Sequence, residues 1–207
     1  MGSVNLDNTG SGSAVTLSSD GTSLLLDGSA IGGGGSPDLF SENYDGSTTK
    51  PNAVGTNAVA IGKNAVAGGG SSLAAGALSS SAATLSSAIG FNATVGSGGS
   101  YAAAIGQAYA NGTDSFAAAI ATNSSSYGAL GANTIAMGNR AKASDSVSIA
   151  IGQDVISSNS SIAIGLDNTT SGTYSIGIGA NADATAPYAT ALGRNAQATH
   201  QLSLIHI

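Results

Sequence analysis

The sequence predicts an all-β protein whose main part is a parallel β-roll, a solenoid of about ten 14-residue coils with two short strands each. Two observations lead to this prediction. A short phrase recurs at a nearly constant spacing from residue 57 onward, and Ala, Ser and Gly, with 38, 33 and 31 copies, make up about half of the 207 residues. Because alanines bury little area each and only 4% of the residues are aromatic, a thick globular core is excluded.

The repeated phrase has the pattern of a strand with two different faces. It ends on Gly in nine of ten copies, as in NAVAIG (57–62) and SIAIG (148–152), and successive copies end 13 to 17 residues apart. The residue before the closing position is usually Ile, and the one before that is Ala in nine copies and Gly177 in the tenth. An apolar residue often precedes this Ala, which gives the period of two that a strand requires and a helix lacks.

We expect the large side chain and the glycine of each copy to form the interior of the roll and its turns. These positions are Ile61, Gly62, Ile89, Gly90, Ile105, Gly106, Met137, Gly138, Ile151, Gly152, Ile164, Gly165, Ile178, Gly179, Leu192 and Gly193. The copies that end in Ala75-Gly76 and Ile120-Ala121 are weaker, and the 17-residue step before Met137 contains an extra YGALG (127–131), where we expect a bulge or loop.

A second pattern, Gly-x-x-Ala-x-Ala, follows the first in copies such as GKNAVA (62–67) and GRNAQA (193–198), and it predicts the second strand of each coil. Gly, Asn, Asp and Ser fill the junctions, as turns with positive φ require. The roll is assigned to residues 57–201. An Ile row on one side of so thin a roll leaves apolar surface uncovered, and the sequence therefore predicts a homo-oligomer, namely a homotrimer.

The N-terminal part is built differently. Residues 14–28, AVTLSSDGTSLLLDG, predict a small β-hairpin, because two alternating apolar runs flank Ser-Asp-Gly. We assign residues 1–31 as an attachment segment with this hairpin, and residues 32–56, which begin with GGGGS, as a Gly-rich linker and connector. Residues 1–56 hold six acids against Lys50, so most of the net charge of −6 lies there. Such a surface disfavours nucleic acid and anionic membranes as partners, and no apolar stretch is long enough for a membrane span.

The pattern Ser-x-Ala-Ile-Gly-x-x-Ala-x-Ala, over residues 57–201, resembles the head repeats of trimeric autotransporter adhesins. The resemblance implies a trimeric left-handed parallel β-roll. The leader, VNLDNTGSGSAVTLSSDGTSLLLDG and the acidic Gly-rich stretch after it, is similar to the opening of virion structural and tail-fibre proteins of marine tailed phages, especially cyanophages. A Met start without a secretion signal fits this second resemblance.

The last six residues, LSLIHI (202–207), have two interpretations. They are what translation of a common transposase sequencing adapter gives, in which case they are not native and the gene continues differently beyond Gln201. The alternative is a genuine final strand, because the six residues alternate acceptably.

The sequence indicates no enzyme. There is no Cys, and the two histidines, His200 and His206, lie at the extreme end, so we expect no hydrolase triad among the serines. The acids are not paired at the intervals of a glycosidase, and residues such as Lys63 and Arg194 stand after the closing Gly where a calcium-binding roll needs Asp. The three glycines at 33–35 lack the following Lys-Ser/Thr of a phosphate loop. No catalytic residue, cofactor or metal ligand is therefore expected.

Five tyrosines have two possible roles. They could contact carbohydrate or a host surface by aromatic stacking, or they could pack at the trimer interface next to a strand. They are Tyr101, Tyr109, Tyr127, Tyr174 and Tyr188.

Together the resemblances imply a non-enzymatic virion structural protein, a trimeric fibre or tail-fibre segment that presents a repetitive β-roll to a host receptor or glycan. Residues 1–56 would attach it to other virion proteins. The alternative is the adhesin head domain of a bacterial trimeric autotransporter, located on the bacterial cell surface and binding host matrix or cells.

Overall fold

The computed structural model describes residues 50–119 and 124–206, and before them the backbone of four short strands. The chain divides into two units, Met1–Tyr44 and Asp45–Ile207. Residues 32–49 of the predicted linker and connector (32–56), and Ile120 and Ala121 of the weakest repeat, lie outside the described residues.

The first unit contains a four-stranded antiparallel sheet in sequence order. Its strands are β1 (Val4–Leu6), β2 (Val15–Ser19), β3 (Leu24–Leu26) and β4 (Ser29–Ala30). Strands β2 and β3 pair with Leu17 opposite Leu26 and Ser19 opposite Leu24. The predicted hairpin at residues 14–28 is therefore confirmed, and β1 and β4 extend it on either side.

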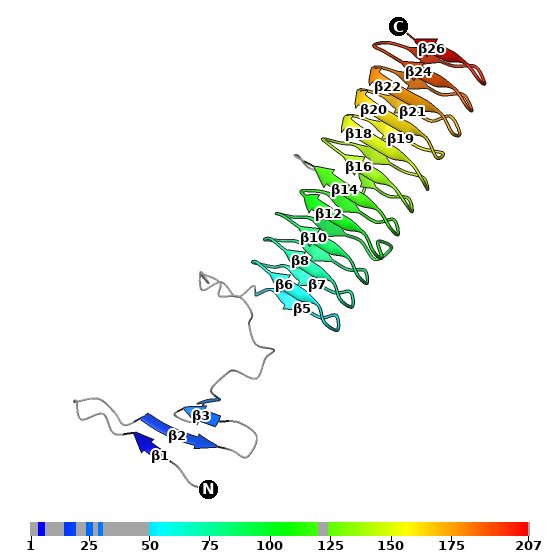
Figure 1. Cartoon of the computed structure of the whole chain (residues 1–207). Helices are drawn as coiled ribbons and strands as arrows, with labels where there is room; N and C mark the ends of the chain where they lie inside the picture. Colours follow the sequence, from blue (N-terminus) through cyan, green and yellow to red (C-terminus); the bar gives the residue numbers. More distant parts are fainter. Residues whose placement is uncertain are drawn as a thin grey trace. The chain divides into compact units, whose positions relative to one another are not determined.

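The second unit is a parallel β-solenoid of about eleven turns, and the described residues contain no helix (Figure 1). Its coils stack into two eleven-stranded parallel sheets, which we call the long-strand sheet and the short-strand sheet. The long-strand sheet consists of β6 (Val59–Ile61), β8 (Leu73–Ala75), β10 (Ser87–Ile89), β12 (Ala103–Gly106), β14 (Phe116–Ala119), β16 (Ile135–Met137), β18 (Ile149–Gln153), β20 (Ile162–Leu166), β22 (Ile176–Ala180), β24 (Thr190–Leu192) and β26 (Leu204–His206). The short-strand sheet consists of β5 (Asn52–Ala53), β7 (Val66–Ala67), β9 (Ser80–Ser81), β11 (Thr94–Val95), β13 (Tyr109–Ala110), β15 (Gly128–Ala129), β17 (Lys142–Ala143), β19 (Ile156–Ser157), β21 (Thr169–Thr170), β23 (Asp183–Ala184) and β25 (Gln197–Ala198).

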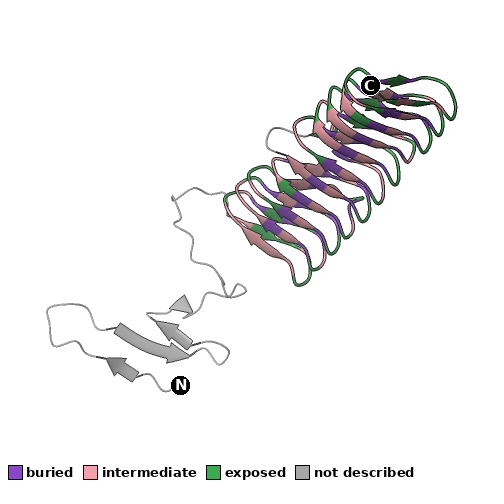
Figure 2. Ribbon diagram, turned by 45° about the horizontal axis from the view of Figure 1, so that its top comes forward, coloured by how far each residue is buried: buried purple, intermediate pink, exposed green. Residues whose placement is uncertain are grey.

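Small residues fill the space between the two sheets (Figure 2). Ala88, Ala136 and Ala150 of the long strands are fully buried, and so are Ala143 and Ala184 of the short strands. The prediction that the large side chains line the interior is wrong. Strand alternation places them on the outer side of the long-strand sheet, because an interior only one thin layer deep accepts Ala, Ser or Val and has no room for a row of Ile.

The closing glycines all have positive φ, between +75° and +147° from Gly62 to Gly193. Five of them directly follow a long strand, as the predicted turns require, whereas Gly106, Gly152, Gly165 and Gly179 lie within the bounds of theirs. Two of them show why no side chain fits. A Cβ on Gly165 would lie 2.1 Å from the carbonyl oxygen of Gly179 in the next coil, and one on Gly179 would lie 2.3 Å from that of Gly193. The glycines therefore stack backbone on backbone along one edge of the roll.

The pairing register differs from the sequence expectation in the weakest repeat. Gly106 pairs with Ala119, two residues before the expected closing position Ala121. A shift of two residues keeps every side chain on its face, so the alternation of the sequence could not exclude it. Gly128 and Ala129 of YGALG form strand β15, so the extra phrase is a short strand and not the bulge or loop that we expected there. A turn precedes it at residues 124–127, and residues 120–123 lie outside the described residues.

The solenoid is also longer than the ten predicted coils. Strand β5 pairs Asn52 with Val66 and Ala53 with Ala67, so the first coil takes up residues that we assigned to the connector. At the other end β26 pairs with β24, with Ile205 beside Ala191. Ile205 occupies an inward position that holds Ala or Gly in the ten other coils. The adapter interpretation of residues 202–207 stays a prediction.

Candidate interaction surface

The outer side of the long-strand sheet is an apolar surface that runs along the whole solenoid. Each long strand contributes two outward positions, and the parallel register aligns them into two columns. The first column is Val59, Leu73, Ser87, Ala103, Phe116, Ile135, Ile149, Ile162, Ile176, Thr190 and Leu204, and the second is Ile61, Ala75, Ile89, Ile105, Ala118, Met137, Ile151, Ile164, Ile178, Leu192 and His206. We call these two columns the apolar face.

The apolar face combines exposure with a lack of charge. Sixteen of its 22 residues are Val, Leu, Ile, Phe or Met, and none is Asp, Glu, Lys or Arg. Within the single chain Ile89, Ile105 and Leu192 are about two-fifths exposed, with relative areas of 42%, 43% and 40%. Monomeric proteins in water rarely expose a continuous apolar surface of this extent, so the apolar face is a candidate site of association.

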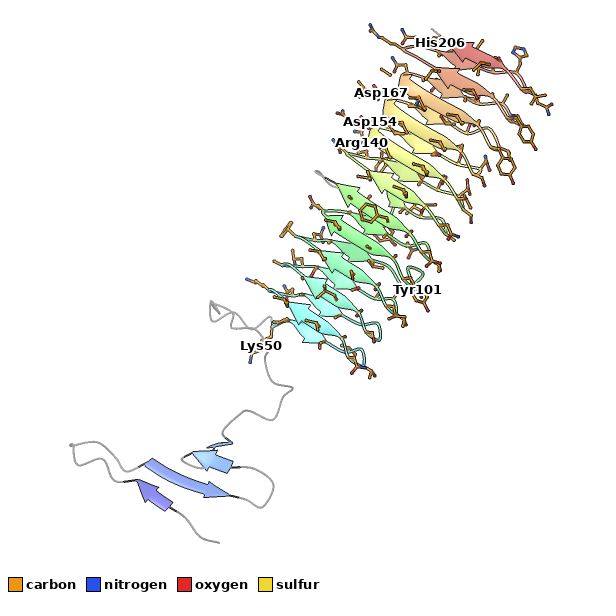
Figure 3. The ribbon with its side chains drawn as sticks, viewed as in Figure 1. Lys50, Tyr101, Arg140, Asp154, Asp167 and His206 are labelled. Atoms are coloured by element: carbon orange, nitrogen blue, oxygen red, sulfur yellow. The ribbon has the colours of Figure 1, made fainter. Side chains whose placement is uncertain are left out.

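The charged residues lie elsewhere on the roll. Lys142 and Asp183 point outward from the short-strand sheet, and Asp183 accepts a hydrogen bond of 2.9 Å from the backbone N–H of Thr169. Arg140 forms an ion pair with Asp154 of the next coil, at the turns that follow the long strands. Figure 3 shows Arg140, Asp154 and Asp167 in successive coils along one edge. The second unit therefore has a polar side and an apolar side.

Both turns of a coil carry a residue in the left-handed region. The leading row, just before each long strand, consists of Asn57, Ser71, Leu85, Tyr101, Asp114, Asn133, Val147, Ser160, Tyr174, Tyr188 and Leu202. The trailing row, just after the long strands, consists of Asn64, Leu78, Asn92, Arg140, Asp154, Asp167, Asn181 and Asn195. Asn, Asp and Ser were expected at such positions, but the large residues of the leading row were not.

Three of the five tyrosines with two possible roles belong to the leading row. Tyr101, Tyr174 and Tyr188 are more than half exposed, and the rings of Tyr174 and Tyr188 stack with centroids 5.8 Å apart. The other two lie apart from them. Tyr109 is an outward residue of the short-strand sheet, and Tyr127 stands just before β15. Aligning the repeats on their closing glycines would have shown the row, because its members precede that glycine by a nearly constant five residues.

The described part of the chain shows no constellation for catalysis. No group of three or more His, Asp or Glu gathers there as a metal site would require. The buried polar side chains are hydroxyls and one amide, most of which bond within the roll, such as Ser157 to Ser161 and Thr170 to Asn168. The hydroxyls of Ser72 and Ser115 are the exceptions among the described residues, since they have no hydrogen-bond partner. No helix among the described residues is long and apolar enough to cross a membrane. The absence of enzyme activity stays a prediction.

Comparison with known families agrees with this geometry. Residues 53–79, 129–154, 157–182, 171–196 and 184–201 match the YadA head domain repeat. These segments of the solenoid therefore resemble YadA head repeats. The matches leave out residues 80–128, where the register spacing departs most from 14 residues, as from Phe116 to Ile135. No curated protein matches the chain. The YadA-head-type repeats are those of a β-roll found in surface adhesins, and the architecture of this chain is of that kind.

Proposed function

We propose that this chain is a homotrimeric fibre segment of a phage virion, a tail fibre or similar appendage, that presents its β-roll to a host surface. The observation that carries the proposal is the apolar face in a solenoid with segments that resemble YadA head repeats. Copies of the chain would cover this face by packing it around a common axis, since a closed symmetric arrangement leaves no apolar column in water. The number three rests on the likeness to YadA head repeats.

In this arrangement the short-strand sheet and its turns stay outside. The outward positions of that sheet are mostly polar, as at Lys142, Thr169 and Gln197, although Val66 and Ile156 also stand there. Three chains present the same row three times. Weak contacts of each coil with a host receptor or glycan then add through avidity, so strong adhesion needs no single deep pocket.

The N-terminal unit supports the phage setting. Its four-stranded antiparallel sheet is separate from the solenoid, and its acidic, Gly-rich sequence is similar to the leaders of phage virion proteins. We assign to it the attachment to other virion proteins. The second candidate is the head of a bacterial trimeric autotransporter adhesin on the cell surface, which the match to the YadA head domain repeat favours.

The genes beside this one distinguish the two settings. Capsid, portal or tail genes next to the reading frame are expected for a virion fibre. A coiled-coil stalk and an outer-membrane anchor in the same frame would contradict the virion assignment and establish the autotransporter.

Adhesion is tested with the full chain. The purified, fluorescently labelled protein is mixed with bacterial envelopes, and the sedimented fraction is measured. We expect retention that falls steeply when the protein is diluted below the concentration at which it remains oligomeric, because avidity is then lost. Equal retention of oligomer and monomer would contradict the multivalent mechanism.

A further inference from the structure

The leading and trailing rows have the same backbone but opposite chemistry. In both, a residue with φ near +57° donates its N–H to a carbonyl of the preceding coil, as Leu85 does to Gly70 at 2.9 Å and Leu78 does to Lys63 at 2.8 Å. Left-handed backbone favours Gly and Asn in both rows and disfavours aromatic and branched side chains. The local backbone therefore cannot explain a difference in residue type between the two rows.

The difference is large. In the trailing row, seven of eight residues are polar or charged and Leu78 is the one large apolar residue. In the leading row, five of the ten residues before Leu202 are large and apolar or aromatic: Leu85, Tyr101, Val147, Tyr174 and Tyr188. They are exposed in the single chain, at 47% to 62%. Large residues in an unfavourable conformation, exposed to water, indicate a surface that another molecule covers.

The position of the leading row indicates that the covering molecule is another copy of this chain. Each of its residues stands two positions before the first column of the apolar face, so the row borders that face along its whole length. Figure 3 shows Tyr101 at the edge opposite the one that carries Arg140, Asp154 and Asp167. Of the leading row only Asp114 is charged. The row is therefore continuous with the surface proposed to join the copies of this chain.

The sizes of neighbouring side chains are consistent with one molecule covering both the leading row and the apolar face. Wherever the first column of the apolar face has a small residue, the leading row of the same coil has a large one. The three pairs are Leu85 with Ser87, Tyr101 with Ala103 and Tyr188 with Thr190. Each coil thus offers at least one large side chain at this border, as a close-packed layer of three identical coils requires.

We infer that the leading row is a third column of the interface between copies of this chain, at which its large side chains pack against the neighbouring copy. This inference rests on the proposed homotrimer. A glycan is the weaker occupant, because Tyr174 and Tyr188 stack on one another and so cover one face of each ring that a sugar would use. The residue type of the leading row also varies from coil to coil, whereas the second column is mostly Ile. The leading row would therefore distinguish copies aligned in the correct axial register from copies shifted by one coil.

The test compares two leucines that differ only in their row. Leu85 and Leu78 have φ of 57° and 61° and exposures of 47% and 44%, and both are replaced by Asn in the full chain. Asn already occupies this conformation at Asn57 and Asn133, so both variants relieve the backbone and should fold. If the row were only a solvent-exposed turn, both would unfold at the same or a higher temperature than the unchanged protein.

We expect Leu85→Asn to lower the thermal midpoint by on the order of 5 °C and to raise the concentration of half-dissociation at least tenfold, while Leu78→Asn leaves both unchanged or improved. Tyr188→Asn serves as a second variant with the same expected loss. Equal behaviour of Leu85→Asn and Leu78→Asn in a trimeric protein would overturn this inference alone. An unchanged protein that is monomeric at every concentration would overturn the homotrimer, and the inference with it.

Discussion

Gly177 provides a quantitative test of how tightly the interior of the solenoid is packed. It occupies the inward position that is Ala in the coils before and after it, at Ala163 and Ala191. A Cβ added to Gly177 would lie 2.2 Å from Oγ1 of Thr170 and 3.0 Å from Oδ1 of Asn168. These two side chains are fully buried on the opposite strand, where most other coils have Ala or Ser. The glycine therefore compensates for the larger residues across the interior.

The cost of Gly177→Ala follows from this geometry. Thr170 cannot withdraw, because its hydroxyl donates a 2.8 Å hydrogen bond to Asn168, whose amide in turn donates one of 2.9 Å to the carbonyl oxygen of Gly177. Overpacking of this kind costs about 1–3 kcal/mol. A Gly to Ala change at a φ that Ala tolerates returns about 0.4–1 kcal/mol through the unfolded chain. We expect a net loss of about 1–2 kcal/mol, since the first effect exceeds the second.

The same change should cost less once the opposing side chains are removed. With Asn168→Ala and Thr170→Ala in place, only the backbone oxygen of Ala182, 2.8 Å from the added Cβ, still crowds the methyl group, so the loss from Gly177→Ala should fall by about 1 kcal/mol. Urea unfolding followed by circular dichroism, in both backgrounds, measures the two effects. If Gly177→Ala had the same sign and size in both backgrounds, the compensation across the interior would be refuted.

Other changes test the turns and the surfaces. Ile151→Asp places a charge on the apolar face and should reduce the mass measured by light scattering to that of a monomer, whereas Asp183→Ala on the polar side should leave it unchanged. Gly152→Ala should destabilise by on the order of 4 kcal/mol in thermal unfolding, because its Cβ would lie 1.8 Å from a backbone oxygen at φ +133°; Gly68→Ala, with its nearest contact at 3.7 Å, should stay within about 0.5 kcal/mol. Arg140→Ala removes an ion pair whose Arg140 side chain is 54% exposed and whose Asp154 side chain is 19% exposed, and it should lower the stability by about 1 kcal/mol or less. A larger loss that shrinks at high salt would contradict this expectation.

Periodicity in the sequence predicts much of this fold. The Ala-Ile-Gly phrase identifies the long strands, and the closing glycines identify positions of positive φ, because both depend on local rules of alternation and backbone conformation. The hairpin at residues 14–28 follows from turn chemistry in the same way. These features can be predicted without knowing which residues pack against one another in the tertiary structure.

The features that the sequence did not predict depend on packing between distant residues. Alternation predicts that the Ile and Ala of a strand face opposite ways, but it does not predict which of them faces inward. Ala faces inward because the interior of the stacked coils is thin. Alternation also does not distinguish two pairing registers that differ by two residues, so it does not predict the pairing of Gly106 with Ala119. Gly177 is the one exception to Ala at its position of the repeated phrase, and the reason is that Thr170 on the other sheet occupies the space of a methyl group.

The leading row was missed for a different reason. The sequence predicts Asn, Asp and Ser at left-handed positions; it leaves Tyr188 between glycan contact and packing at the trimer interface, and no motif in it marks Leu85. Only a comparison with the trailing row, which has the same backbone and a polar composition, shows that the large residues need an explanation. That comparison requires the structure, since it depends on which turn lies beside the apolar face.

The mass of the full chain in solution tests the central claim that three copies share the apolar face. Sedimentation equilibrium over a wide concentration range measures this mass without a shape assumption. The account predicts a species of three times the 19.6 kDa of one chain, which dissociates only at the lowest concentrations. A stable, folded species of 19.6 kDa at every concentration would contradict it.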